Sequence, residues 1–116
     1  MIRRNDERIS GRKPAPFGGS GEVTITCLLN NPEEMEGKGR AFNHITVYPG
    51  SEIGYHVHHG DAETYYILSG SGLYNDNGTE VQLSAGDVAY CAAEEGHGLK
   101  NNTDQPLEMI ALILYA

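Results

Sequence analysis

The sequence predicts an all-β domain, a barrel or sandwich of about nine short strands. Three observations support this prediction. Runs rich in β-branched and aromatic residues recur along the 116 residues, 15 glycines supply close turns between them, and no stretch shows the period of a long helix. A chain of this length forms a single core and leaves no room for a second module.

Residues 1–21 are expected to form an extended arm, and residues 22–116 the barrel. Pro14 and Pro16 favour an extended backbone, and the glycine-rich residues 18–21 are a flexible break. Four of the eight basic residues lie in the first twelve positions. Because acidic residues accompany them there, a solvated terminus is favoured over an anion-binding arm.

The strands are predicted from hydrophobic alternation and from the turns that bound them. Pro32 suits the first position of a short helical turn. Asn77 and Gly78 predict a hairpin, because this pair accepts the positive φ of a primed turn. Residues 107–115 are an almost unbroken apolar run and should be a buried strand. The expected strands are residues 22–29, 40–48, 52–58, 63–68, 73–74, 79–83, 88–92, 96–101 and 107–115.

Composition excludes several classes of partner. The formal charge of −8 opposes nucleic-acid binding, which needs a cationic surface. The two cysteines are too few for a disulfide scaffold, and no apolar stretch is long enough for a signal peptide or a membrane span. We therefore expect a cytoplasmic protein whose partner is a small molecule, with neither nucleic-acid nor membrane partners.

The histidines are concentrated in one constellation. His56 and His58 lie two residues apart in a predicted strand, so they project from one face about 6.6 Å apart along it. Glu63 opens the next strand and lies beside them after an antiparallel return, whereas His97 must come from a distant strand. Three imidazoles and one carboxylate are a ligand set for a first-row transition metal. A lone His-x-His pair would usually be two solvent-exposed polar side chains, but the combined spacing favours a metal site.

That spacing resembles the first motif of the cupin family. It reads Gly50-x5-His56-x-His58-x4-Glu63-x6-Gly70. The second motif is matched at Gly86-Asp87, His97 and Asn101. It departs from the family at Ala92, where proline is usual, and at Glu94, where glycine is usual.

The resemblance is to small single-domain cupins often labelled oxalate-decarboxylase-like. It implies a double-stranded β-helix, or jelly roll, with one divalent ion of manganese, iron, nickel, cobalt or zinc inside the barrel. The implied ligands are His56, His58, Glu63 and His97. Asn101 would be a neighbour of the site and not a ligand.

Four protein ligands on a six-coordinate ion would leave two positions for a small hydroxy or keto acid. This predicts a metalloenzyme of isomerase, decarboxylase or dioxygenase type that acts on a small polar organic acid or sugar derivative. A non-catalytic metal- or ligand-binding module is the alternative. A storage or structural barrel ranks last, because the four ligand residues are all present.

Candidate catalytic residues follow from position along the chain. Tyr65 shares the inward parity of Glu63, so it could bind a substrate or simply fill the barrel. Glu94, in the loop before His97, could act as a general acid or base. Arg40 and Asn43 could bind a substrate carboxylate at the barrel mouth.

The apolar run at residues 107–114 and Phe17 in the arm suggest more apolar surface than a small barrel can bury. Small cupins are similar in usually being dimers. We therefore expect a homodimer in which residues 1–29 contribute to the interface, and the resemblance implies that the N-terminal arm of residues 1–21 can be exchanged between subunits.

Overall fold

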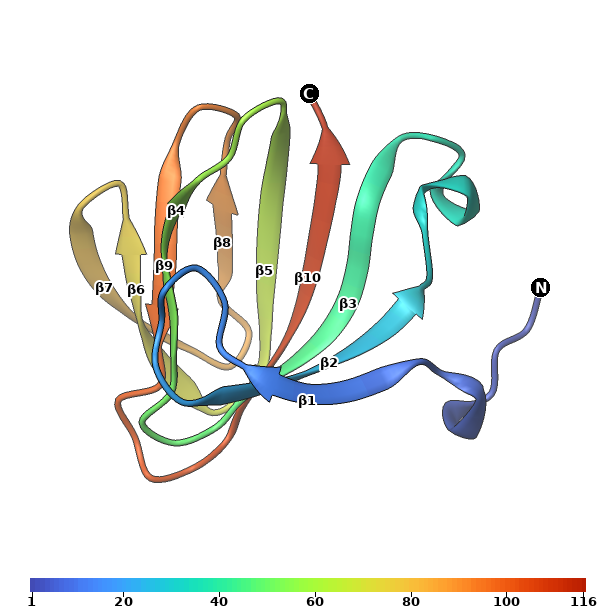
Figure 1. The fold of residues 1–116 in the computed structure, drawn as a ribbon. Helices are drawn as coiled ribbons and strands as arrows, with labels where there is room; N and C mark the ends of the chain where they lie inside the picture. The colour runs from blue at the N-terminus through green and yellow to red at the C-terminus, as the bar shows by residue number, and fades with distance from the viewer.

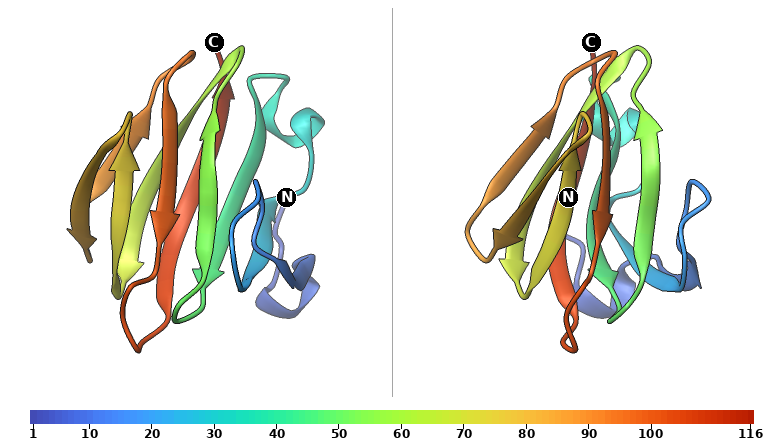
Figure 2. Two further views of the ribbon diagram at one scale, coloured as in Figure 1. Left: turned by 60° about the vertical axis from the view of Figure 1, so that its left-hand side comes forward. Right: turned by 90° about the vertical axis from the view of Figure 1, so that its left-hand side faces the viewer.

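Two antiparallel sheets face each other in the computed structural model, which describes all 116 residues (Figures 1 and 2). The six-stranded sheet has the order β1-β2-β3-β10-β5-β8, and the four-stranded sheet the order β4-β9-β6-β7. The strands are β1 (Ser10–Pro14), β2 (Glu22–Leu29), β3 (Gly39–Val47), β4 (Glu52–Val57), β5 (Asp61–Ser69), β6 (Ser71–Asp76), β7 (Thr79–Ser84), β8 (Val88–Cys91), β9 (Gly96–Lys100) and β10 (Leu107–Tyr115). This is the predicted all-β jelly roll.

The core lies between the sheets, where alternate residues of each strand point inward. In β5, Tyr65 and Ile67 are buried while Tyr66 and Leu68 are exposed, as their parity with Glu63 predicted. The most deeply buried apolar side chains come from both sheets and include Val23, Val47, Ile67, Leu99, Leu107 and Met109. The alternation of the sequence therefore sets which residues face the interior.

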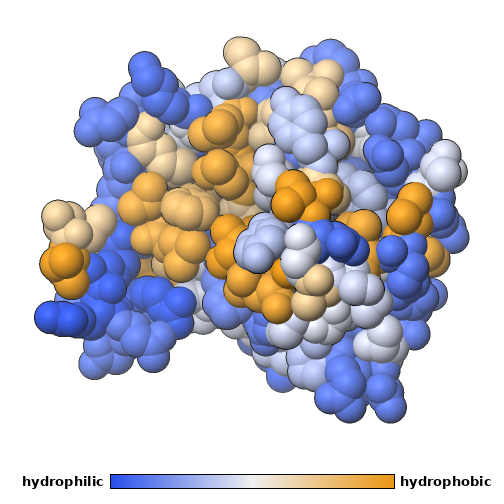
Figure 3. All heavy atoms as spheres, turned by 180° about the vertical axis from the view of Figure 1, so that it is seen from behind, coloured by the Kyte–Doolittle hydropathy of each residue, from blue (hydrophilic) through white to orange (hydrophobic).

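The final strand differs from its prediction. We expected residues 107–115 to form a buried strand, but only alternate residues are buried: Leu107, Met109, Ala111 and Ile113. Leu114 is exposed on the outer face of the sheet, which nothing covers, and Tyr115 is exposed because the strand ends there. Figure 3, which views the molecule from behind, shows apolar side chains gathered on that side.

Part of the N-terminal segment that we expected to be an arm forms a strand of the six-stranded sheet. Residues 10–14 form β1, which pairs with β2 from Ser10↔Thr26 to Pro14↔Glu22. All five β1 residues are exposed, so no apolar alternation marks this strand, and backbone pairing holds it at the sheet edge. A short 3-10 helix, η1 (Asn5–Glu7), precedes it. The expected turn at Pro32 is a second one, η2 (Pro32–Met35), whose N-terminus is capped by Asn31.

A bulge in β4 aims the first histidine. The register of the β4–β9 pairing shifts between the pairs Ile53↔Leu99 and His56↔His97. Over this interval the chain advances three residues along β4 and two along β9. The extra residue lets both Ile53 and His56 line the interior, although they have opposite parity. Tyr55, which precedes His56, points outward and is exposed.

Neither 3-10 helix is long or apolar enough to cross a membrane.

Candidate metal centre

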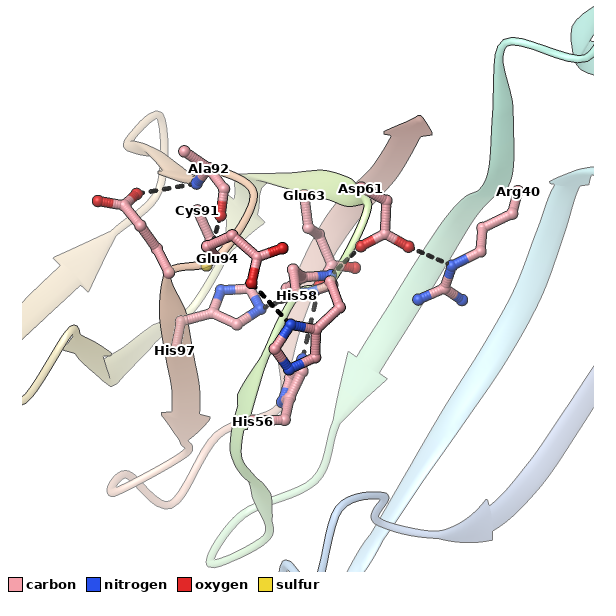
Figure 4. Close-up of polar contacts among 11 residues, drawn as sticks. Arg40, His56, His58, Asp61, Glu63, Cys91, Ala92, Glu94 and His97 are labelled. Carbon is pink, nitrogen blue, oxygen red and sulfur yellow. Dashed lines mark hydrogen bonds and ion pairs between the residues drawn. The ribbon is translucent and has the colours of Figure 1, made fainter. Parts of the chain in front are cut away.

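Four side chains converge at one end of the barrel (Figure 4). His56 lies near the end of β4, His58 follows that strand, and His97 lies opposite His56 on β9. Glu63 comes from β5, in the other sheet. One ligand atom from each residue lies within 4.8 Å of the other three. The distant strand thus brings His97 to the pair on β4, as the sequence spacing required.

The distances between these atoms suit a single small cation. Oε1 of Glu63 lies 3.1 Å from Nε2 of His58 and 3.0 Å from Nε2 of His97, and the two Nε2 atoms are 3.1 Å apart. His56 Nε2 lies 4.0 Å from the same oxygen. Ligands about 2.0–2.1 Å from one ion and at right angles would be about 2.9 Å apart. The nitrogen and oxygen donors therefore fit a divalent first-row ion.

The remaining nitrogen of each imidazole is also held. Nδ1 of His58 lies 2.7 Å from Oδ1 of Asp61, and Nδ1 of His56 lies 2.8 Å from the carbonyl oxygen of Gly54. Nδ1 of His97 lies 2.8 Å from the hydroxyl oxygen of Tyr74. When each Nδ1–H donates to its oxygen, the Nε2 lone pair is left for the shared position. These three contacts fix the orientation of all three rings around that position.

Two of these partners were missed in the sequence. Asp61 was not among the candidate residues, yet it is the first residue of β5 and is buried. Its parity with Glu63, two positions later, was a usable signal for an inward side chain. Tyr74, on β6, is 3 % exposed. No local pattern connects it with His97, because their contact joins neighbouring strands 23 residues apart.

The electrostatics of the cluster favour charged carboxylates. Burial tends to raise the pKa of Glu63, but hydrogen bonds from His58 and His97 outweigh it and lower that pKa. Burial likewise opposes the charged form of Asp61, and its bonds to Arg40 and His58 reverse that effect, so its pKa is lowered. The hydrogen bond to Glu63 raises the pKa of His58, whereas burial lowers that of His56. Two carboxylates are therefore available to balance a cation.

A cavity of about 210 Å³ adjoins the cluster. Arg40 and Asn43 of β3 line it together with Tyr65, as expected for residues at a barrel mouth. Arg40 Nε donates a 2.6 Å hydrogen bond to Oδ2 of Asp61, and its terminal nitrogens make no hydrogen bond within the protein (Figure 4). The Tyr65 ring lies 4.9 Å from that of His97. Burial raises the pKa of Tyr65 well above its ordinary value, so its hydroxyl stays protonated.

The loop before His97 accommodates its two unusual residues, Ala92 and Glu94, through local backbone geometry and hydrogen bonding. Glu94 adopts φ 70°, a left-handed conformation that glycine would adopt without strain. The N–H of Ala92 donates to the Glu95 carboxylate at 2.9 Å, a bond that proline could not make. The Glu94 carboxylate is exposed and accepts a 2.8 Å bond from His59, which is itself exposed and does not join the cluster.

Two further residues lie away from the cluster. Asn101 does not adjoin the site as expected, because its amide nitrogen donates to the carbonyl oxygens of Val47 and Gln105. It holds the turn between β9 and β10. His44 is on the outer face of β3, where it lies 2.6 Å from Glu108. Cys91 is buried and Tyr90 is exposed, so only one of this pair points inward.

A family model described as a cupin domain matches residues 43–113, more than half of the chain. This chain belongs to the cupin family. An oxalate-binding protein from Thermotoga maritima is 42% identical to this cupin over 114 residues, which are 98% of this chain and 93% of that protein.

Solved structures show that this cupin has the double-stranded β-helix fold. The crystal structure of a predicted oxalate decarboxylase from Thermotoga maritima, at 1.95 Å, superposes over the whole of both chains with a TM-score of 0.94 and 39% identity. KdgF from Halomonas sp. has a TM-score of 0.74 at 16% identity, covering 100% of this cupin and 96% of that chain. That likeness shows the fold alone.

Proposed function

We propose that this cupin binds a small chelating carboxylic acid, of the oxalate class, at a divalent metal ion held by His56, His58, Glu63 and His97. The observation that carries the proposal is the convergence of these four donors, with the three imidazole rings already oriented, at a small cavity that His56, His58 and Glu63 line. A bound ion would supply positive charge and Lewis acidity there. Manganese, iron, nickel, cobalt and zinc all suit such nitrogen and oxygen donors.

The cavity supports a small ligand. Its volume of about 210 Å³ is below the roughly 300–1,000 Å³ of cavities that hold drug-sized molecules. An acid of two or three carbons fits this space beside the metal ligands. The name of the Thermotoga relative, an oxalate-binding protein, supports the same class.

The charges around the cavity support an anion. Lys13 and Arg40 both line it, and the terminal nitrogens of Arg40 are free to donate a bidentate pair to a carboxylate. Asp61, which anchors Arg40, also holds His58. One carboxylate thus positions both a metal ligand and the proposed ligand-binding guanidinium.

The second candidate is a metalloenzyme of isomerase, decarboxylase or dioxygenase type acting on such an acid or on a sugar derivative. One observation favours it: Tyr65 presents a protonated hydroxyl in the cavity lining beside Glu63 and could donate a proton. Glu94, the other candidate, lies in an exposed loop, bonded to His59. Glu63 is the only carboxylate in the lining, and this favours binding without turnover.

The first experiment is metal analysis by plasma mass spectrometry, on protein purified anaerobically without a chelator or a metal-affinity tag. About one ion per chain is expected, and His58→Ala should lose it. His59→Ala is the matched control, because this neighbouring histidine is exposed and faces away. No bound metal and no uptake on titration would overturn the proposal.

Calorimetry then tests the ligand. The metal-loaded protein should bind oxalate, and the metal-free protein should not. Acetate, which has a single carboxylate, should bind far more weakly. Incubation with oxalate followed by product analysis separates the two candidates. Turnover that Tyr65→Phe abolishes would support the enzyme, and unchanged oxalate would support the binding module.

We also propose a homodimer, as expected from the sequence. Support comes from the apolar side chains on the outer face of the six-stranded sheet, where Tyr66, Val88, Tyr90 and Leu114 are exposed. A cytoplasmic location remains a proposal, supported by two cysteines that are not joined in a disulfide.

A further inference from the structure

The segment between β1 and β2, residues 15–21, lies flat against β4. The N–H of Gly54 donates to the carbonyl oxygen of Pro16 at 3.0 Å, and Ser20 exchanges two backbone hydrogen bonds with Glu52. The approach is so close that a Cβ on Gly54 would lie 2.0 Å from the carbonyl oxygen of Phe17. The segment is therefore held in one place relative to the strand that carries His56.

Phe17 has an unusual conformation within this segment. Its φ is 61°, a left-handed value that is strained for a bulky side chain. The side chain is 57 % exposed, so burial in the core does not offset that strain. Its ring instead stacks on the imidazole of His56, with centroids 3.7 Å apart and planes inclined by 13°.

Phe17 also belongs to the wall of the cavity. Phe17 and Pro16 line the cavity from the side of β4, which belongs to the four-stranded sheet. Arg40 and Asn43 line it from β3, which belongs to the six-stranded sheet. The side chain of His56 is only 10% exposed beneath it. A ligand that reaches the metal ligands must share this limited space with the phenyl ring.

We propose that Phe17 is the specificity-determining residue of this cavity, and that its ring limits the ligand to the smallest chelating acids. This inference rests on the proposed function, because it names the residue that discriminates by size among chelating carboxylic acids. The rigid backbone contacts of residues 15–21 keep the ring in place, so that size discrimination does not depend on closure of a mobile lid. Removing the ring should open the cavity above His56.

The test compares oxalate with the larger chelating acids malonate and citrate, by calorimetry on metal-loaded protein of measured metal content. Phe17→Ala should improve binding of the larger acids relative to oxalate by roughly tenfold or more. Phe17→Gly should do the same, and it also relieves the strained φ. Phe42→Ala is the matched control, since Phe42 is the other phenylalanine of the chain and lies on β3 outside the cavity lining.

A second readout needs neither metal nor ligand. Diethyl pyrocarbonate acylates accessible histidines, and mass spectrometry locates the modified residue. In metal-free protein, Phe17→Ala should raise the rate at His56 several-fold, while exposed His59 serves as the internal standard.

The two outcomes separate the inference from the proposed function. If oxalate binds and neither selectivity nor His56 acylation changes in Phe17→Ala, the role of Phe17 is overturned. If no acid binds the metal-loaded wild type, the proposed function fails, and a raised acylation rate at His56 would still show that Phe17 covers the cavity.

Discussion

Tyr74 Oη lies 2.8 Å from Nδ1 of His97. Burial raises the pKa of Tyr74 above its ordinary value, so the phenol stays neutral and can accept the Nδ1–H of the imidazole. His97 is 1 % exposed, and its Nε2 faces Glu63 and His58. When the Tyr74 oxygen accepts the Nδ1–H, the Nε2 lone pair of His97 is left for the position shared with Glu63 and His58.

Tyr74→Phe should weaken metal binding without removing the ring from the core. Loss of such a partner typically costs about 10–100-fold in metal affinity. Competition with a chelator of known affinity measures this change. Tyr66→Phe, on the outer face of β5, is the control and should leave affinity unaltered. Equal affinities for the two variants would show that Tyr74 does not position His97.

Arg40→Gln should weaken acid binding more than metal binding. The guanidinium lines the cavity and its terminal nitrogens are free, so the variant loses a charge-assisted pair to the carboxylate. Such bonds contribute about 1.5–3 kcal/mol, which corresponds to a loss of about 10–100-fold in oxalate affinity. Calorimetry and metal analysis together measure the effect. Arg12→Gln is the control, because Arg12 pairs with Glu22 at the surface. An unchanged oxalate affinity in Arg40→Gln would exclude this residue from the ligand site.

Asn101→Ala should lower stability and leave the metal centre intact. Its buried amide group bonds the carbonyl oxygens of Val47 and Gln105 and two groups of Thr103, in the turn between β9 and β10. Leaving buried groups without partners costs about 1–3 kcal/mol each, so we expect at least about 2 kcal/mol less free energy of unfolding in urea. The exposed Asn102→Ala is the comparison. Loss of metal from folded Asn101→Ala protein would contradict this assignment.

Gly54→Ala should disturb the contact between residues 15–21 and β4. The added Cβ would lie 2.0 Å from the Phe17 carbonyl oxygen, which is backbone and cannot turn aside. Overpacking of this kind costs about 1–3 kcal/mol of unfolding free energy. Gly11→Ala on β1, where no atom lies within 4 Å of the new Cβ, should be close to neutral. Two variants of equal stability would show that the close approach is not maintained in solution.

The proposed homodimer predicts twice the chain mass by light scattering at micromolar concentration. Val88→Glu or Tyr90→Glu, on the exposed face of β8, should shift the mass toward the monomer, because burying a charge at an interface without a partner is unfavourable. The sequence also assigned residues 1–29 to the interface. A truncation of residues 1–9 that leaves the mass per particle at two chains would argue against a role for that first segment. A monomeric wild type would refute the dimer altogether.

Much of this cupin could be predicted from local sequence. Strand alternation placed Tyr65 inward and Tyr66 outward, and the His-x-His spacing put His56 and His58 on the same side of the chain. These inferences succeed because side chains of a strand alternate between two faces, whatever the strand packs against. β1 was missed because all its residues are exposed, and β10 was taken as fully buried because the sequence cannot show that its sheet lacks an outer layer.

The sequence by itself determined the all-β class, the pairing of the His-x-His histidines with Glu63 and the alternating faces of most strands, since these depend on spacing along the chain, and the resemblance to cupins added the jelly roll and His97. The tertiary structure alone decided which atoms orient those donors. Tyr74 reaches His97 across neighbouring strands, and Phe17 reaches His56 from a segment 39 residues away. The bulge between Ile53 and His56 changes which residues face inward. Such contacts depend on register and on sheet packing, which hydrophobic periodicity does not encode.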